Sequence, residues 1–249
     1  MKIRNILFIL TLFFIIFLCG CNDPLKRYEY DDLSYSYTYD SMGEQCVTIM
    51  ELSEQGKQQE RVVIPTHIGK LLVKGFGKEF AYRIEGVIES DNLKQIYIHN
   101  QIEMINNNFF AEIEDVTVFC GFDGENPLSI SYYFIRCKEI YISKSDHEWL
   151  KSIDQTIDFY DKIRFANVIY YYNFDKDKTF FVDDCDGTTV NVIPPTPYRK
   201  GYEFAGWYKE PECINEWNFE NDIVPAKEYD ENGEYILKET KLYAKWEKK

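Results

Sequence analysis

Asn92-Leu93-Lys94-Gln95-Ile96-Tyr97-Ile98-His99 is the stretch of sequence that decides the fold. Its alternating apolar residues predict a short strand with one buried face. Two related runs follow it along the chain, Glu114-Asp115-Val116-Thr117-Val118-Phe119 and Lys138-Glu139-Ile140-Tyr141-Ile142-Ser143. The apolar pairs Ile96/Ile98, Val116/Val118 and Ile140/Ile142 recur after 20 and 24 residues. A period of this length is typical of stacked solenoid repeats, in which each copy adds one strand.

The segment Leu93 to Phe110 follows a pattern that runs roughly LKxIxIPxxVxxIGxxAFxxC, and an earlier copy begins at Arg61-Val62-Val63-Ile64-Pro65. In these residues the chain resembles the BspA-type leucine-rich repeats of bacterial surface proteins. His99, Asn106 and Phe109 stand where Pro, Gly and Ala are usual, and Cys137 matches the buried Cys of the repeat. The resemblance covers about residues 33–145 and implies a leucine-rich-repeat solenoid.

Both ends of this array carry the signs of a cap. Leu33, Tyr35, Tyr37 and Tyr39 alternate with polar residues, which predicts a half-buried strand that forms a hairpin with residues 46–50. This hairpin matches the N-terminal cap of the BspA-type family. Ser145-Asp146-His147-Glu148 has the form of a helix capping box, so we expect an amphipathic capping helix over 146–160. The leucine-rich-repeat domain is therefore predicted to span residues 33–163.

A second module is predicted over residues 167–249. It has expected strands at Val168–Tyr172 and Asn191–Pro195, followed by Gly201-Tyr202-Glu203-Phe204-Ala205-Gly206-Trp207-Tyr208, Cys213, Trp217-Asn218-Phe219 and Thr240 to Trp246. These residues resemble the internalin-type B repeat, also called the Listeria–Bacteroides repeat, with its signature GYxFxGWYxxxxCxxxWxF…TxLYAKW. The resemblance implies a small β-grasp-like fold, with an insertion near 229–235 that lengthens a loop. We expect the aromatic residues to form the core of so small a domain; the alternative is that some of them stack on a ligand.

The N-terminus reads as an export signal. Lys2 and Arg4 precede 13 apolar residues, too few to span a bilayer, and the run ends in Leu18-Cys19-Gly20-Cys21. This ending resembles the lipobox of bacterial lipoproteins, which implies removal of residues 1–20, lipidation of Cys21 and a polar tether over 21–32. A diacylglycerol there would hold the protein at the extracytoplasmic face of the cell membrane. The alternatives are a signal peptide that is cut elsewhere and an uncleaved anchor.

Composition and charge exclude several classes of protein. Hydrophobic residues make up 45% of the chain, which argues against wholesale disorder. The formal net charge is −14, and a body this acidic lacks the basic footprint that nucleic-acid binding requires. Five cysteines besides Cys19 and Cys21 remain, and we expect buried thiols with at most one or two disulfides. Whether any of them pair stays open at this point.

No catalytic constellation, metal site or cofactor motif is found in the sequence. His67, His99 and His147 lack neighbours at metal-ligand spacing. The acids Asp175, Asp177, Asp183, Asp184 and Asp186 lack the order of a calcium loop, so we expect them in solvated hairpin loops. The sequence therefore predicts a protein that is not an enzyme. A carbohydrate-active enzyme, the alternative, would need two acids about 5–10 Å apart in a cleft.

The face of the solenoid sheet is the predicted binding surface. Stacking the copies by their apolar pairs predicts three ladders: Arg61, Gln95, Asp115 and Glu139; Val63, Tyr97, Thr117 and Tyr141; and Pro65, His99, Phe119 and Ser143. The candidate binding residues are Tyr97, Phe119, Tyr141, His99, Asp115 and Glu139. An exposed sheet of this kind suits a basic protein or a glycan; the alternative is that its aromatic residues only stabilise neighbouring strands.

These observations predict a lipid-anchored protein of the bacterial surface that acts in adhesion and recognises a protein or glycan partner through its leucine-rich-repeat sheet. The alternative is a structural spacer or assembly factor of the cell envelope with an endogenous protein partner. The sequence predicts a mainly β fold with short helices under either interpretation.

Overall fold

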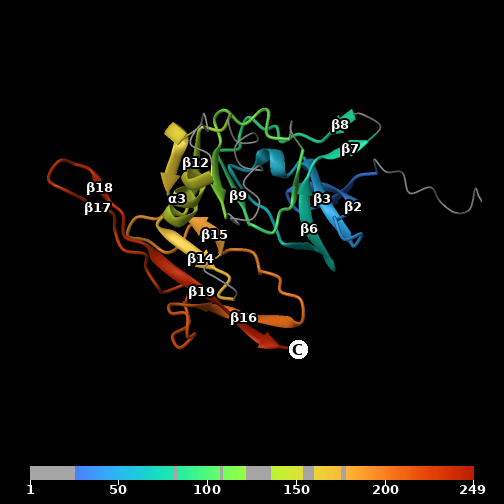
Figure 1. Ribbon diagram of the computed structural model, residues 1–249. Helices are drawn as coiled ribbons and strands as arrows, with labels where there is room; N and C mark the ends of the chain where they lie inside the picture. The colour runs from blue at the N-terminus through green and yellow to red at the C-terminus, as the bar shows by residue number, and fades with distance from the viewer. Residues whose placement is uncertain (1–25, 81–82, 107–108, 122–135, 154–159, 175–177) are drawn as a thin grey trace, which may run out of the picture.

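The computed structural model describes residues 26–80, 83–106, 109–121, 136–153, 160–174 and 178–249 (Figure 1). The predicted signal peptide, Cys21 and the first part of the tether lie outside these residues. The described chain is mainly β, as expected, with one α-helix, α3 (Lys144–Ile153), and two short 3₁₀ turns, η1 (Gly56–Gln58) and η2 (Tyr160–Lys162). Within the described ranges, none of the helices has the length and apolar character that crossing a bilayer requires.

A five-stranded parallel sheet lies at the centre of the molecule. Its strands are β13 (Ile163–Phe165), β12 (Glu139–Ile142), β11 (Thr117–Cys120), β9 (Gln95–Ile98) and β4 (Arg61–Val63), in that spatial order. Each neighbour in the sheet is the next of these five strands along the chain, and all pairs are parallel. The register aligns Ile96, Val118, Ile140 and Ile163, so the strand returns every 22 or 23 residues.

The predicted register of the middle copy is wrong by two residues. Val118 and Cys120 pair with Ile96 and Ile98, where the sequence pattern had placed Val116 and Val118. The ladder beside Tyr97 and Tyr141 therefore contains Phe119 and not Thr117, and Asp115 lies before the strand, exposed. Val116 is buried all the same, because the turn that leads into β11 packs it against the core. Period-two alternation alone does not fix the phase of a strand only four residues long.

A mixed sheet forms the N-terminal side of the molecule. Its order is β1 (Tyr28–Tyr30), β2 (Leu33–Tyr39), β3 (Gln45–Leu52), β6 (Leu71–Phe76) and β10 (Met104–Ile105), with β5 (His67–Ile68) pairing with β6. The predicted hairpin is confirmed as β2 and β3, which are antiparallel from Leu33↔Leu52 to Tyr39↔Gln45. A bulge between Ser34 and Tyr35 interrupts the expected alternation, so four consecutive residues, Leu33 to Ser36, are buried. A separate small hairpin joins β7 (Lys78–Phe80) and β8 (Arg83–Glu85).

The mixed sheet and the parallel sheet share one apolar core. Aliphatic residues of the parallel sheet, such as Ile96, Val118 and Ile140, belong to the same buried cluster as Val47 and Phe76 of the mixed sheet. Helix α3 adds Leu150 to this cluster, with Trp149 half-buried beside it. The predicted capping helix is thus present as far as residue 153, while residues 154–159 lie outside the described part. We refer to residues 26–165 as the N-terminal part.

The cap of α3 differs from the predicted one. Ser143, which is fully buried, accepts a hydrogen bond from the backbone N–H of Asp146 at 3.0 Å, and its hydroxyl donates to the Asp146 carboxylate. The capping residue is therefore Ser143, at the end of β12, rather than Ser145. A polar cap at this point satisfies one of the helix's free N–H groups inside the protein.

The C-terminal part, residues 166–249, forms a four-stranded sheet with the order β15 (Thr179–Asp183), β14 (Val168–Tyr171), β19 (Thr240–Lys248) and β16 (Tyr202–Tyr208). The predicted strand at Asn191–Pro195 is absent, and β15, which was not predicted, pairs antiparallel with β14. The insertion near 229–235 forms a two-stranded hairpin of β17 (Glu228–Tyr229) and β18 (Tyr235–Ile236), which projects from the left of Figure 1. Trp207 and Trp217 are buried, which confirms a core role for these two aromatic residues.

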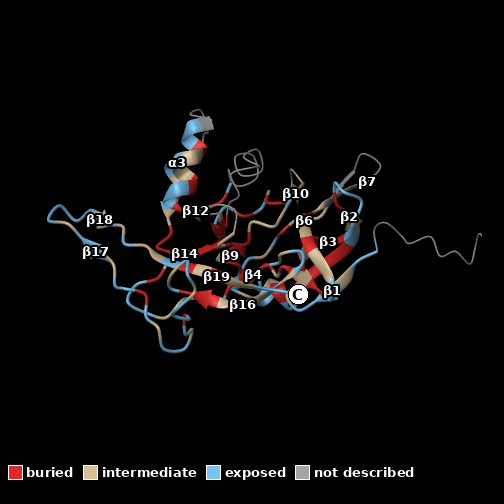
Figure 2. Ribbon diagram, turned by 60° about the horizontal axis from the view of Figure 1, so that its bottom comes forward, coloured by how far each residue is buried: buried red, intermediate tan, exposed pale blue. Residues whose placement is uncertain are grey.

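The C-terminal sheet covers the outer face of the parallel sheet, so the parallel sheet is buried on both sides (Figure 2). Strand β15 lies against β9, β11 and β12. Gly121, at the end of β11, is buried, and a Cβ added to it would overlap the backbone carbonyl of Phe180 in β15. The two parts therefore meet backbone to side chain over their whole shared face, and Gly121 sets how close they come.

We predict that Gly121→Ala destabilises the protein by about 1–3 kcal/mol, because the added methyl group has no room unless β15 moves. Urea unfolding followed by tryptophan fluorescence measures this cost. Gly69→Ala is the control: its Cβ would meet nothing within 4 Å, and its cost is limited to the positive φ of 62°. Equal and small effects of the two substitutions would contradict the close approach at Gly121.

Candidate functional site

The aromatic ladder predicted to bind a partner is packed inside the protein. Tyr97 and Phe119 stack with ring centroids 4.3 Å apart and planes 4° from parallel, and Phe119 stacks on Tyr141 at 4.8 Å. Phe181 of β15 covers Tyr97 at 5.7 Å. Stacked rings with this spacing contribute beyond their buried area, so the ladder holds the two parts together.

The six candidate binding residues therefore have different fates. Tyr97, His99 and Phe119 are buried, so the expectation that they line an exposed sheet is wrong. Tyr141 is half-buried in the same interface, and Glu139 is half-buried and paired with Arg164 at 3.0 Å. Asp115 is exposed but lies outside the ladder. The structure brings the aromatic residues together as predicted, but the C-terminal part covers them.

His99 is fully enclosed between the two parts. Its Nδ1 accepts a hydrogen bond from the N–H of Gln101 at 3.2 Å, which assigns the ring proton to Nε2, and Nε2 donates to the carbonyl of Pro65 at 3.1 Å. The ring lies nearly parallel to Phe180, with centroids 5.9 Å apart. Burial lowers the pKa of His99 to about 4, so the imidazole is neutral at physiological pH.

This buried histidine makes stability depend on pH. In the unfolded chain His99 takes up a proton below its ordinary pKa of about 6.5, whereas in the folded protein it does so only near 4. The free energy of unfolding should therefore fall by up to about 3 kcal/mol as pH drops from 6.5 to 4. Urea titrations at pH 4, 5, 6 and 7 measure this slope, and His99→Gln should flatten it. A slope that is unchanged in the variant would contradict the assignment.

Asp183 is the polar centre of the interface. Its buried carboxylate accepts hydrogen bonds from the backbone N–H of Asn191 at 2.7 Å, the Asn191 side chain at 3.0 Å, the N–H of Asp184 at 2.9 Å and the hydroxyl of Tyr97 at 3.1 Å. A buried carboxylate needs several donors of this kind, since burial removes its water shell. Arg61 strengthens the same junction by donating to the carbonyl of Asn191 at 3.0 Å. The expectation that Asp183 lies in a solvated loop is therefore wrong.

The remaining acids of that run follow the prediction in part. Asp186 is exposed, and Asp184 is half-buried and paired with Lys227 at 2.5 Å. Burial raises the pKa of Asp184, while the ammonium group of Lys227 opposes this shift. Asp175 and Asp177 lie outside the described residues. In the part of the chain that the structure describes, no group of three His, Cys, Asp or Glu residues has the arrangement of a metal site.

Two buried tyrosines give a matched test of the interface. Tyr97→Phe removes a hydrogen bond to a charged group and should cost about 1.5–3 kcal/mol of unfolding free energy. Tyr170→Phe is the control, because the Tyr170 hydroxyl is buried and has no hydrogen-bond partner among the described residues. Its removal should leave stability unchanged or raise it. Chemical denaturation of both variants checks this, and a loss of equal size in the two would rule out a specific role for the Tyr97–Asp183 bond.

The described cysteines are free thiols. Cys46, Cys120, Cys137 and Cys185 are buried and Cys213 is half-buried, which confirms the expected buried thiols. Burial raises the pKa of Cys120 to about 12 and that of Cys46 to about 11. Thiols held in this state are poor nucleophiles, so these two cysteines serve packing rather than chemistry.

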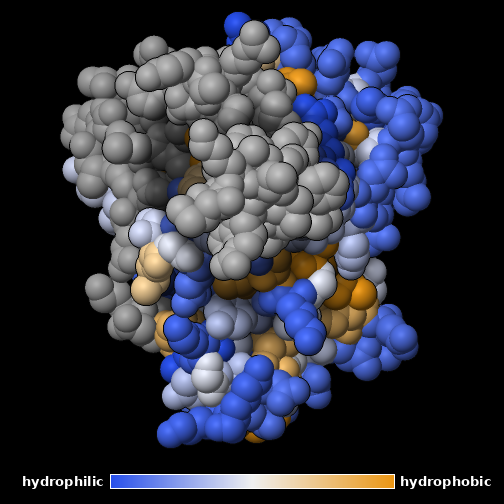
Figure 3. Space-filling view, turned by 90° about the vertical axis from the view of Figure 1, so that its right-hand side faces the viewer, coloured by the Kyte–Doolittle hydropathy of each residue, from blue (hydrophilic) through white to orange (hydrophobic). Residues whose placement is uncertain are grey.

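A cleft of about 330 Å³ opens where the two parts meet, and it is the strongest candidate for a ligand site. Both parts line it: Leu72, Lys74, Asn100, Gln101 and Glu103 come from the N-terminal part, and Tyr172, Phe174, Lys178 and Tyr198 from the C-terminal part. Its volume lies at the lower end of the range for small-ligand pockets. Figure 3 views the side of the molecule that carries β6, where apolar atoms gather among hydrophilic side chains on the lower half of the face.

The charges in the cleft are largely paired. Lys74 contacts the Asp40 carboxylate at 2.7 Å and the Glu103 carboxylate at 2.9 Å. Burial opposes the charged form of Lys74, but hydrogen bonds to the two carboxylates outweigh it and raise its pKa. The hydrogen bond from Lys74, with those from the backbone of the 40–44 turn, lowers the pKa of Asp40. This trio fixes one wall of the cleft and places Glu103 at its rim.

Backbone groups at the cleft walls are already bonded within the protein. Glu103 N–H donates to the Lys74 carbonyl at 2.8 Å, Tyr172 N–H to the Lys178 carbonyl at 3.0 Å, and Asn100 N–H to the Phe180 carbonyl at 3.0 Å. The Gln101 side chain bonds both the N–H and the carbonyl of Tyr198, at 2.9 and 3.0 Å. The cleft therefore presents side chains to a ligand rather than an open strand edge.

One polar atom in this wall lacks a partner. Asn100 donates from its side-chain amide to the carbonyl of Thr179, but its amide oxygen is buried without a hydrogen-bond partner among the described residues. Orphaned polar atoms are uncommon in folded proteins and are found most often at functional positions. Aromatic rings surround this amide, since Tyr172, Phe174 and Tyr198 line the same cleft.

The residues of the second wall lie in β14, β15 and the loops that follow them. Residues 170–229 match the family model of the Listeria–Bacteroides repeat domain. The match includes all four C-terminal residues of the cleft, but it ends before β19, the strand that joins β14 to β16. The repeat as matched therefore needs residues 240–248 to complete its sheet. No solved structure matches the chain.

Sequence reasoning missed this site. Its residues come from six separate stretches of sequence, and none of them forms a motif at fixed spacing. The aromatic residues Tyr172 and Phe174 were seen only as core or strand residues, and Tyr198 as the start of the repeat signature. A cleft formed by docking two parts has no local signal in the sequence, because it depends on the register of β15 against the parallel sheet.

Proposed function

We propose that this protein is a lipid-anchored binding protein of the bacterial cell surface, and that it holds its ligand in the cleft between its two parts. The lipobox-like ending at Cys21 supports the anchor, and the Listeria–Bacteroides repeat, a surface-associated bacterial repeat, supports the location. The cleft itself is the observation that carries the binding function. The ligand site thus moves from the sheet face, which is covered, to the neighbouring junction.

The finer family assignments belong to the same proposal. Parallel strands that return every 22 or 23 residues with aligned apolar side chains support a BspA-type leucine-rich-repeat solenoid over 33–163. The mixed four-stranded sheet supports a β-grasp-like fold over 167–249. Recognition of a partner on the cell surface, and hence adhesion, fits an exported protein with no catalytic constellation.

A glycan suits the cleft better than an extended peptide does. A peptide that binds by strand addition needs free N–H and C=O groups along an edge, and at this cleft those groups are bonded internally. A saccharide presents apolar C–H faces to aromatic rings and hydroxyl groups to amides and carboxylates. Phe174, Tyr198, Gln101 and Glu103 offer both kinds of contact within one cleft.

A structural spacer in the cell envelope is the second candidate. The observation that favours it is the closed aromatic ladder, because the surface expected to recognise a partner is used within the chain. A spacer of this kind would have one dominant endogenous protein neighbour, which crosslinking in intact cells would detect.

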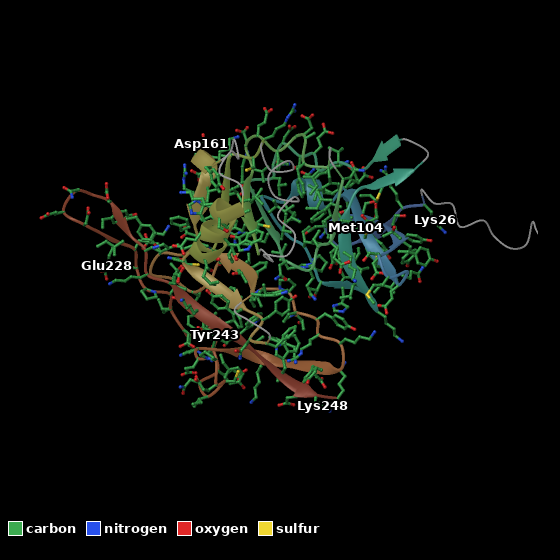
Figure 4. The ribbon with its side chains drawn as sticks, in the orientation of Figure 1. Lys26, Met104, Asp161, Glu228, Tyr243 and Lys248 are labelled. Atoms are coloured by element: carbon green, nitrogen blue, oxygen red, sulfur yellow. The ribbon has the colours of Figure 1, made fainter. Side chains whose placement is uncertain are left out.

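Glycan-array binding by the full chain in mild detergent tests the proposal. We expect binding to at least one glycan class, weakened about tenfold or more by Tyr198→Ala, since aromatic contacts carry much of the affinity at such sites. Tyr229→Ala is the control, because Tyr229 is exposed on the projecting hairpin. Figure 4 places Glu228 of this hairpin on the opposite side of the molecule from Met104, the neighbour of Glu103. An array without binding, or equal effects of the two substitutions, would reject the cleft as the ligand site.

A further inference from the structure

Arg199 occupies an unusual position at the edge of the cleft. Its guanidinium carbon lies 3.7 Å from the ring centroid of Tyr202 and 4.1 Å from that of Phe174, with Trp246 at 5.8 Å. Phe174 lines the cleft, and so does Tyr198, the residue before Arg199. The guanidinium is therefore held by aromatic rings next to the proposed ligand site.

No acid neutralises this cation. Among the described residues Arg199 forms no ion pair and no side-chain hydrogen bond, although the chain has 42 acidic and 28 basic residues. Other cations nearby are paired, including Lys74 with Asp40 and Glu103 and Lys200 with Glu44. In so acidic a protein, a cation that is bound by rings and not by carboxylates keeps its donors available.

The geometry prepares Arg199 to bind an anion. Aromatic rings contact the flat faces of a guanidinium, while its five N–H donors lie in the plane and point outward. Packing between rings also removes rotamer freedom before a ligand arrives, so less entropy is lost on binding. A carboxylate or a phosphate matches the planar fork with two parallel hydrogen bonds.

We infer that the ligand of the cleft is an anionic saccharide whose carboxylate or phosphate group pairs with Arg199. Its sugar rings would lie among the aromatic and amide side chains of the cleft, next to Phe174 and Tyr198. Lys178, which also lines the cleft, adds positive charge on the same side. This inference rests on the proposed function, because it names the ligand class of the same site.

Calorimetric titration of the full chain in mild detergent tests the inference with three oligosaccharides of equal length. These are maltohexaose, which is neutral, hexagalacturonate, which carries carboxylates, and phosphorylated maltohexaose. We expect at least one of the two acidic probes to bind about tenfold or more tighter than maltohexaose, and the pair identifies which anion is preferred. Binding of the acidic probe should weaken as salt is added.

Substitutions at position 199 assign the effect to Arg199. Arg199→Gln should weaken the acidic probe about tenfold to a hundredfold and leave maltohexaose unchanged, since a charged hydrogen bond is lost. Arg199→Lys keeps the charge but loses the planar fork, so its affinity should fall between the two. Lys200→Gln is the matched control: it removes the same charge from the next residue, which is exposed and paired with Glu44 at 3.6 Å.

Two results would overturn the inference and are distinct from failure of the proposed function. Equal affinity for acidic and neutral probes, or unchanged acidic binding in both Arg199 variants, would mean that Arg199 only stabilises the aromatic cluster. The cleft would then remain a site for neutral glycans, as long as Tyr198→Ala still weakens binding. Loss of all binding, with no effect of Tyr198→Ala, would reject the proposed function itself and the inference with it.

Discussion

Double-sided burial of the central parallel sheet is the constraint on which the rest of the structure depends. Sheets made only of parallel strands are found almost always with both faces covered. Here the aliphatic face packs against the mixed sheet, and the aromatic face, with Tyr97, Phe119 and Tyr141, packs beneath Phe181 of β15. The C-terminal part is therefore the cover of the sheet and not an appendage beside it.

Polar contacts make this cover specific as well as tight. Stacked rings alone tolerate sliding, whereas the carboxylate of Asp183 must meet its donors in one register. Tyr97, Asn191 and Arg61 link the two parts at that point, and Gly121 allows the backbone of β15 to approach. The cleft exists only because this register holds, since its two walls come from different parts of the chain.

Local patterns predicted the hairpin of β2 and β3, the succession of parallel strands and the buried tryptophans of the C-terminal part. They failed where the outcome depends on contacts between distant residues. Val118 and Cys120 take the core positions because neighbouring strands set the phase of β11. Asp183 looked like a loop residue because nothing in its neighbourhood announces the Tyr97 hydroxyl, 86 positions earlier. The aromatic ladder was identified, but an exposed and a covered face carry the same residue types.

The connection between the two parts consists of Ala166 and Asn167 alone, which lie between β13 and β14 and are both buried. Ala166 N–H bonds to the carbonyl of Ile142, and Asn167 exchanges side-chain hydrogen bonds with Cys185 while its carbonyl accepts from Thr240. A joint this short leaves no slack between the parts. The repeat in this protein is thus not an interchangeable cassette: a gene fusion that transplanted it, or replaced it with a distant cousin, would strip the lid from its neighbour's strands.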